Sequence, residues 1–330
     1  MKLARAGIFF GGAFAGVALG CAPPAPGAPA ADSTVAVAAE LDALSRGVTR
    51  GHEATFLSIL DDTLSADAYH CLPSPRRVFS ADAPDGERRI AGVMPHYGFF
   101  FGPMSYLLRH RAGRWEVDVR IAVELPTEGD VMELPDCAIP RELEGDRGDI
   151  AEVGATCAGT PYSASPSLSA CPGSGTFSIV GTRGAQLALL RRWSREAASY
   201  WNRDAAAFGL PVRYRFTFEP SAAVPPGFAD LRVPLALTCG RTPYFSAFRS
   251  GWSLPIVAHE VGHVLGLLDE YETFSGLSPC YPKTPFPGAE VSRMGLSMRE
   301  GTLVLPLHHY LVLRRYFCEE PPAGPYEGGL

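Results

Sequence analysis

The feature that most restricts how this chain can fold is a run of reactive side chains between His259 and Asp269. His259 and His263 are four residues apart, so on a helix their imidazoles face the same side. Asp269 follows six residues after His263, and on a continuing helix it would lie ~9 Å further along the axis. Gly266 lies between them and tolerates positive φ, so the helix can end there. The spacing therefore predicts a chain that turns back beneath the two imidazoles and brings Asp269 to them.

Two imidazoles at this spacing can bind one zinc ion through Zn–N bonds of ~2.0–2.1 Å. We expect His259, His263 and Asp269 to be the protein ligands, which leaves one position of the metal open for water, as in catalytic zinc sites. Glu260 directly follows the first histidine, so its carboxylate flanks the metal. It is the expected general base, which takes a proton from water and passes it to a leaving amine. The expected cofactor is Zn²⁺, and the oxygen ligand makes the site more tolerant of other divalent ions.

The array HExxHxxGxxD resembles the metzincin clan of zinc metalloendopeptidases, whose pattern is HExxHxxGxxH followed by a Met-turn. The small extracellular neutral proteases of the snapalysin type share the aspartate at the third ligand position. The resemblance implies the ligands and the general base named above, and a methionine beneath the metal. Met294 is the expected Met-turn residue, with Met298 as the alternative. The clan's variable tyrosine ligand, two residues after the methionine, has no counterpart, because Leu296 occupies that position.

The same resemblance implies a peptidase domain over residues 176–320, with a twisted sheet, an active-site helix, the Met-turn and a C-terminal helix. In this clan the strand before the active-site helix holds an extended peptide through backbone hydrogen bonds. Here that strand would fall within Leu231 to Phe248. The implied partner is a protein or peptide substrate.

Hydrophobic patterning predicts an α+β fold. Alternating apolar residues predict strands, and apolar residues three and four apart predict helices. The expected strands are 90–94, 104–110, 115–125, 177–180, 212–218 and 231–237. The expected helices are 184–208, 253–268 with Ser253 as its N-cap, and 306–317, and helical periodicity also occurs in parts of 35–64.

Composition, together with the resemblances to the metzincin clan and to an export signal, implies five segments in the chain. They are a signal peptide over 1–21, a tether over 22–32, an N-terminal α/β region over 33–125, a connection rich in Cys, Ser, Gly and Pro over 126–175, and the peptidase domain over 176–320. The role of the N-terminal region stays open among a pro-segment, an inhibitor-like cover and a binding domain.

The first residues have the composition of an export signal. Lys2 and Arg5 precede an uncharged stretch that is shorter than the ~20 residues of a membrane span. The residues before Cys21 resemble a bacterial lipoprotein signal, in which this cysteine is lipidated, although Ala18 stands where the pattern prefers a large aliphatic residue. We expect an exported protein of the cell envelope, associated with the membrane through Cys21. The alternative is ordinary signal cleavage after residues 28–30, which would give a secreted protein.

The chain has eight cysteines, so seven remain besides Cys21. In the oxidising compartment that an exported chain enters, most of them can pair. Because seven is an odd number, at least one is free or paired elsewhere. The segment around Cys137 faintly resembles the cysteine switch of matrix metalloproteases but lacks its arginine and glycine, which favours a structural disulfide. The preferred pairs are Cys157–Cys171 and Cys239–Cys280.

Charge and repeats exclude several classes of protein. The formal net charge is −6, so there is no basic excess to displace the counterions of a nucleic acid. Heptads, internal repeats and a second long apolar span are absent from the sequence, which excludes coiled coils, solenoids and polytopic membrane proteins. The sequence gives no indication of the oligomeric state.

Other polar residues near the motif have simpler interpretations. We expect Glu270 and Tyr271 to cap or pack, and His308 and His309 to pack or to lie at the surface, because they begin an apolar helix. The alternative function is a surface zinc-binding lipoprotein, in which the N-terminal region binds a partner and the metal is structural.

Overall fold

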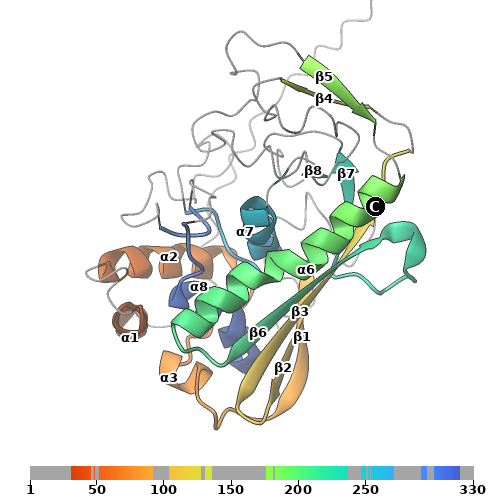
Figure 1. The fold of residues 1–330 in the computed structure, drawn as a ribbon. Coiled ribbons are helices and arrows are strands. Elements are labelled where there is room, and N and C mark those ends of the chain that lie inside the picture. The colour runs from red at the N-terminus through yellow and green to blue at the C-terminus, as the bar shows by residue number, and fades with distance from the viewer. Residues whose placement is uncertain are drawn as a thin grey trace, which may run out of the picture.

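The fold is α+β, as the sequence predicts, with a mixed sheet and helices packed against it (Figure 1). The computed structural model describes residues 31–45, 48, 52–91, 104–127, 131–135, 176–180, 183–236, 247–249, 252, 254–270, 291–295 and 301–319 of the 330-residue chain. Within these ranges no helix is long and apolar enough to cross a lipid bilayer. The expected signal peptide, with Cys21, lies outside them.

The described strands form a six-stranded sheet around one long strand, β3. Its strands are β1 (Gly86–Ala91), β2 (Ser105–Arg111), β3 (Arg114–Glu124), β6 (Val212–Pro220), β7 (Leu231–Ala236) and β8 (Phe248–Arg249). β1, β2 and β3 are antiparallel neighbours, whereas β6 and β7 pair with β3 in parallel and β8 pairs with β7 in parallel. Strands that the sequence assigns to the region 33–125 and to the domain 176–320 therefore share one sheet.

Strand β3 contacts three neighbours because it is long enough to pair with two strands along one edge. That edge pairs with β2 as far as Asp118 and with β7 from Ile121 onward. The opposite edge pairs with β6 from Trp115 to Val123. The predicted alternation is confirmed from Arg114 to Val117, whereas residues 117–119 and 121–123 are all buried, as is typical of a strand covered on both faces.

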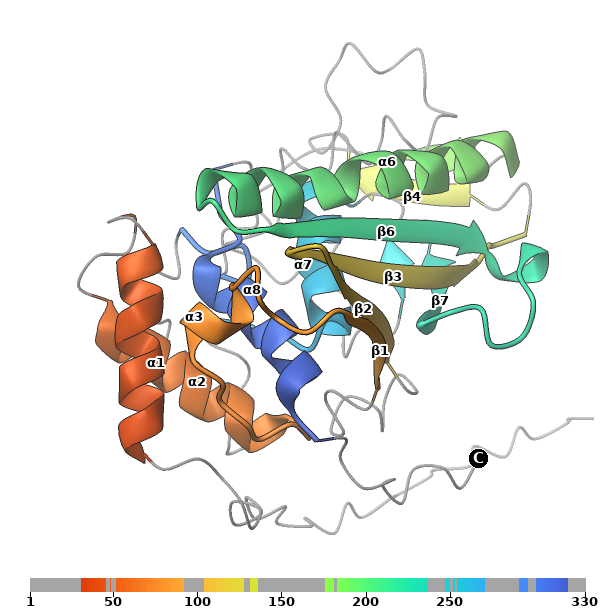
Figure 2. The same ribbon diagram turned by 90° about the horizontal axis from the view of Figure 1, so that it is seen from below.

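Helices lie against the sheet and gather at one end of it. They are α1 (Ala31–Leu44), α2 (Glu53–Ala66), α3 (Pro75–Val78), α6 (Arg183–Ala207), α7 (Leu254–Val264) and α8 (Pro306–Leu313), with the 3-10 helices η4 (Ser221–Ala223) and η6 (Arg314–Phe317). Helix α6 runs alongside β6, and α1, α2 and α3 lie near α8 at one end of the molecule (Figures 1 and 2). Strands β4 (Val131–Pro135) and β5 (Thr176–Val180) form a separate antiparallel pair. Because α1 begins at Ala31, the last two residues of the expected tether 22–32 are helical.

One hydrophobic core joins the helices to the sheet. Trp193 of α6 packs edge to face against Phe218 of β6, with 5.5 Å between the ring centroids. Trp201 of the same helix donates from Nε1 to the carbonyl of Ala258 in α7 at 3.0 Å. Buried side chains of α1 and α2, such as Leu41, belong to the same core. The described N-terminal residues are therefore packed into one unit with the helix that carries His259 and His263.

A disulfide connects the N-terminal region to the C-terminal end of the described chain. Cys71, which follows α2, is bonded to Cys318, which follows η6, across 247 residues of sequence. The sequence analysis missed this pair, because cysteine spacing does not determine connectivity. The predicted pairs Cys157–Cys171 and Cys239–Cys280 lie outside the described residues.

Candidate metal centre

Helix α7 ends at Val264 because of a glycine turn. The sequence predicts a longer helix, over 253–268, and this prediction is wrong at its C-terminal end. Gly266 has a φ of 80°, a left-handed conformation that glycine adopts without strain. The amides of Gly266 and Leu267 donate to helix carbonyls three and five residues back, at 2.9 and 3.0 Å. This Schellman arrangement ends the helix and turns the chain so that Asp269 returns toward it.

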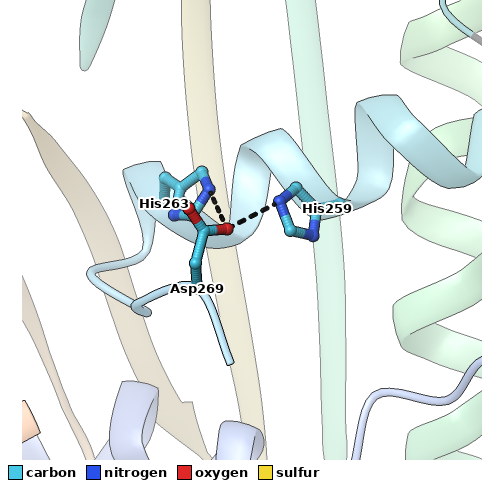
Figure 3. A group of neighbouring side chains, drawn as sticks. All are labelled: His259, His263 and Asp269. Carbon is cyan, nitrogen blue, oxygen red and sulfur yellow. Dashed lines mark ion pairs between the residues drawn. The ribbon is translucent and has the colours of Figure 1, made fainter. Parts of the chain in front are cut away.

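Three side chains meet at this turn (Figure 3). Asp269 Oδ1 lies 3.2 Å from His259 Nε2 and 3.3 Å from His263 Nε2. One ligand atom from each of the three residues lies within 4.8 Å of the others. The two imidazole rings are perpendicular, with centroids 4.8 Å apart. The structure thus brings together the three residues that the sequence expects to bind a metal.

Backbone carbonyl groups fix the orientation of both imidazoles. His259 Nδ1 lies 2.8 Å from the carbonyl oxygen of Arg293, and His263 Nδ1 lies 2.8 Å from that of Leu267. A carbonyl oxygen only accepts hydrogen bonds, so each Nδ1 carries a proton and donates it. In a neutral imidazole Nε2 then has a lone pair. Both of these Nε2 atoms approach Asp269.

Two imidazole Nε2 atoms and a carboxylate oxygen that face one another favour a cation between them, either a proton or a metal ion. Asp269 Oδ1 is buried and has no hydrogen-bond partner of normal geometry among the described residues. Zinc bonds of ~2.05 Å in tetrahedral geometry place neighbouring donor atoms about 3.3 Å apart. The two N–O separations of 3.2 and 3.3 Å agree with this value. Two imidazoles and a carboxylate therefore fit a divalent metal, and zinc is among the metals that bind this donor set.

The charges around the site also stabilise a cation. Burial lowers the pKa of His263, but the carboxylates of Asp269 and Glu260 outweigh burial and raise this pKa to about 9. Burial raises the pKa of Asp269, but the two histidines outweigh it and hold the pKa of this carboxyl well below its usual range. The site is built around an ionised carboxylate that stabilises positive charge beside it.

Glu260 follows His259 on α7 and is partly exposed. Its negative charge acts on His263, so the carboxylate belongs to the same site. The side chains of His263 and Asp269 are 10% and 17% exposed, so solvent reaches part of each side chain, whereas Asp269 Oδ1 itself is buried.

Met294 packs against α7 from a tight turn. Its amide donates to Ser292 Oγ at 3.0 Å, which stabilises the turn. A Cβ at Gly262 would lie 2.5 Å from Met294 Sδ, so the methionine occupies the space where Gly262 lacks a side chain. The same turn supplies the Arg293 carbonyl that orients the first histidine. Met298, the alternative Met-turn residue, lies outside the described residues.

A second buried carboxylate directly follows the ligand aspartate. Glu270 Oε1 lies 2.8 Å from His308 Nε2, and both side chains are almost completely buried. His308 Nδ1 accepts from the amide of Leu305 at 2.9 Å, so Nε2 carries the proton that is donated to Glu270. The amide of Glu270 also donates to the carbonyl of Met294 at 2.9 Å. These contacts give Glu270 and His308 packing roles, as expected from the sequence.

The sequence analysis missed Arg315, which is distant in sequence from the glycine turn but contacts it. Arg315 donates to the carbonyls of Leu265 and Gly266 at 2.6 and 2.9 Å. Arg315 Nε also donates to Asp67 at 2.7 Å. The sequence contains one signal of such a contact, because Arg314 and Arg315 directly follow an apolar helix. Arginines that are buried beside apolar residues are almost always paired with a partner. Nothing local in the sequence connects them to Asp67.

Several predicted features lie outside the described residues. They are Ser253, Tyr271 and Cys137. The strand expected to hold a peptide is described only in part, since β7 lies between β3 and β8 and residues 237–246 are not described.

The fold and the site define an α+β protein with a His-His-Asp centre that fits a divalent metal. Comparison with protein-family models, curated proteins and solved structures finds no match to the chain. The proposals that follow rest on the residues and the geometry of the chain itself.

Proposed function

We propose that this protein is a zinc-dependent endopeptidase. The observation that carries the proposal is the convergence of His259, His263 and Asp269, with Glu260 next to the first ligand. Structural zinc sites have four protein ligands, whereas catalytic sites have three and leave a position open. Among the described residues this group contains three such side chains and no fourth.

The residues of the site divide the chemistry between them. A bound zinc ion would supply Lewis-acid polarisation of the scissile carbonyl and a lowered pKa for water. Glu260 takes a proton from the attacking water and returns it to the nitrogen of the leaving amine. The Nδ1 contacts of His259 and His263 to backbone carbonyls hold both rings in orientation and increase their strength as ligands.

We propose a metzincin-type arrangement for the part of the fold that carries the site. Its support is the sequence of features around α7, which are the two histidines, the turn at Gly266, the contact of Met294 with Gly262, and α8 further along the chain. In this arrangement the substrate is a protein or peptide that lies extended beside the segment Leu231–Phe248.

We also propose that the protein is exported and anchored to the cell envelope through a lipid on Cys21. The support is the signal-like composition of residues 1–21 and the disulfide between Cys71 and Cys318, because disulfides persist in oxidising compartments.

The test combines metal analysis with peptide hydrolysis for two glutamate variants. Glu260→Gln should keep one zinc per chain and lower kcat by roughly 10²–10⁴-fold, because the amide cannot accept the proton of water. Glu116→Gln is the matched control, since it neutralises an exposed carboxylate on β3, and it should keep wild-type activity.

Wild-type activity in Glu260→Gln would contradict the mechanism. Stoichiometric zinc without hydrolysis of any peptide in a broad library would favour the alternative, a zinc-binding lipoprotein without turnover.

A further inference from the structure

The carbonyl groups at the end of α7 are bound by an arginine that lies far away in sequence. Helix C-termini leave carbonyls without intrahelical partners, and a cation there is favoured by the helix dipole. Arg315 Nη1 donates to Leu265 O at 2.6 Å and Arg315 Nη2 donates to Gly266 O at 2.9 Å. A Cβ at Gly266 would lie 2.7 Å from Arg315 Nη2, so the guanidinium is packed directly against the turn.

This guanidinium is in turn fixed by residues of the N-terminal region. Asp67, at the end of α2, accepts from Arg315 Nε at 2.7 Å. The hydroxyl of Tyr106 in β2 accepts from Arg315 Nη1 at 3.0 Å. Burial opposes the charge of Arg315, but Asp67 and Tyr106 outweigh burial and raise its pKa. The side chains of Arg315 and Asp67 are both 0% exposed, so solvent does not screen the pair.

The neighbouring arginine provides an internal comparison. Arg314 is equally buried and also pairs with Asp67. Its Nη1 donates to the carbonyls of Tyr69 and Cys71 in the N-terminal region, at 2.7 and 2.8 Å. Among the described residues, the hydrogen bonds of Arg314 go to the N-terminal region and to Cys318, and none goes to α7 or the glycine turn. Two adjacent arginines therefore share one carboxylate but bind different segments.

We propose that Arg315, supported by Asp67, is a positioning residue of the metal centre. It fixes the turn at Gly266 that places Asp269 opposite the two histidines. It follows that α2 and the residues after it belong to the working site, and that they are not a pro-segment that maturation removes. This proposal rests on the metal-binding part of the proposed function and is independent of peptide hydrolysis.

The first experiment compares Arg315→Lys with Arg314→Lys in the full chain. Lysine keeps the positive charge beside Asp67, but its compact ammonium lacks the planar fork with which the guanidinium reaches Asp67 through Nε and the two carbonyls through Nη1 and Nη2. Zinc affinity, measured by competition with a chelator of known affinity, should fall roughly 10- to 100-fold in Arg315→Lys, as for loss of a residue that orients a ligand. Arg314→Lys should keep wild-type zinc affinity, even if its melting temperature falls as much as that of Arg315→Lys.

A second pair of variants covers the case in which the arginine variants do not fold. Asp67→Asn removes the charge that holds Arg315, and it should weaken zinc binding. Asp230→Asn is its control, because Asp230 is also fully buried and paired with arginines, Arg89 and Arg120, but has no contact with Arg315 among those described. Equal zinc affinity within each pair would overturn the proposal.

Amide hydrogen exchange of the metal-free proteins provides a measurement that needs neither zinc nor substrate. Exchange in residues 265–270 should be faster in Arg315→Lys than in Arg314→Lys. If the wild type binds zinc but cleaves no peptide, the peptidase proposal fails and the affinity comparison still applies. If the wild type binds no zinc, the exchange comparison decides, and equal rates in the two variants overturn the role of Arg315.

Discussion

The buried histidine pairs of α7 and α8 show what distinguishes a metal site from ordinary packing. His259 and His263 on α7 and His308 and His309 on α8 are all buried, and an acidic residue lies beside a member of each pair. The α7 histidines are four residues apart and face the same side of the helix, whereas the α8 histidines are adjacent and cannot do so. Spacing, and not burial or residue type, separates the two pairs.

The two spacings also give the histidines different partners. On α8 each ring has its own partner, because His308 Nε2 contacts Glu270 at 2.8 Å and His309 Nδ1 contacts the hydroxyl of Tyr214 at 2.7 Å. One proton between two atoms satisfies each contact. On α7 two Nε2 atoms approach a single oxygen of Asp269, which leaves a place for a cation. The comparison predicts metal binding at α7 and none at α8.

The largest difference in zinc affinity should appear between two variants that each replace one histidine of a pair by asparagine. Asparagine retains a polar atom near the position of Nδ1 but has nothing at Nε2. His263→Asn should lose more zinc affinity than the ~10–100-fold typical of outer partners, because a direct ligand is removed. His309→Asn should leave zinc affinity unchanged. Chelator competition on both variants measures this difference, and comparable losses would contradict the distinction between the pairs.

The α8 pair should instead make stability depend on pH. Burial, followed by the nearby His308, lowers the pKa of His309 to about 3. A histidine in the unfolded chain has a pKa of ~6.5. Between these values the unfolded state binds the extra proton, so the contribution of His309 is complete above pH ~6.5. It is lost as the pH falls toward about 3, with a slope of up to ~1.4 kcal/mol per pH unit.

Denaturant unfolding of the wild type and His309→Asn at about pH 7 and about pH 4 tests this expectation. The variant should lose less stability between the two conditions than the wild type, because it lacks the titrating ring. A wild type and a variant that lose stability in parallel would show that His309 is not held neutral by burial.

The smallest effect concerns the glycine turn that brings Asp269 to the α7 pair. Gly266 and Gly227 both have positive φ, at 80° and 79°, so alanine at either should cost about 1–2 kcal/mol of backbone strain. A Cβ at Gly227 meets nothing within 4 Å, whereas at Gly266 it meets Arg315. Gly266→Ala should therefore be the less stable variant in urea unfolding, and it alone should weaken zinc binding. Equal effects would mean that the contact with Arg315 is easily relieved.

Local patterns predicted several strands and helices and the group His259, His263 and Asp269, whereas β1 begins earlier than expected, β4 was not expected, and α7 ends earlier than expected. The alternation after Trp115 predicts β3, and the four-residue spacing of His259 and His263 predicts their shared face. Gly266 also predicts that the helix ends and the chain returns. Each of these signals depends on residues within about two helical turns, where sequence periodicity translates directly into geometry.

Long-range contacts could not be predicted in the same way. The parallel pairing of β3 with β6 and β7 joins segments from two regions that composition had divided, and no local residue specifies it. The contact of Asp67 with Arg315 spans 248 residues, and the disulfide of Cys71 with Cys318 spans 247. Such partners are selected by the packing of the whole core, which a single sequence does not display.

The position of Arg315 near the end of the described chain has a consequence for biosynthesis. Ribosomes deliver the two α7 histidines and Asp67 before residue 315 exists. During that interval the carbonyls of Leu265 and Gly266 have no guanidinium to bind, so the loop carrying the third ligand is not yet fixed. A nascent chain would thus carry His259, His263 and Asp269 before the turn that positions Asp269 has its guanidinium partner.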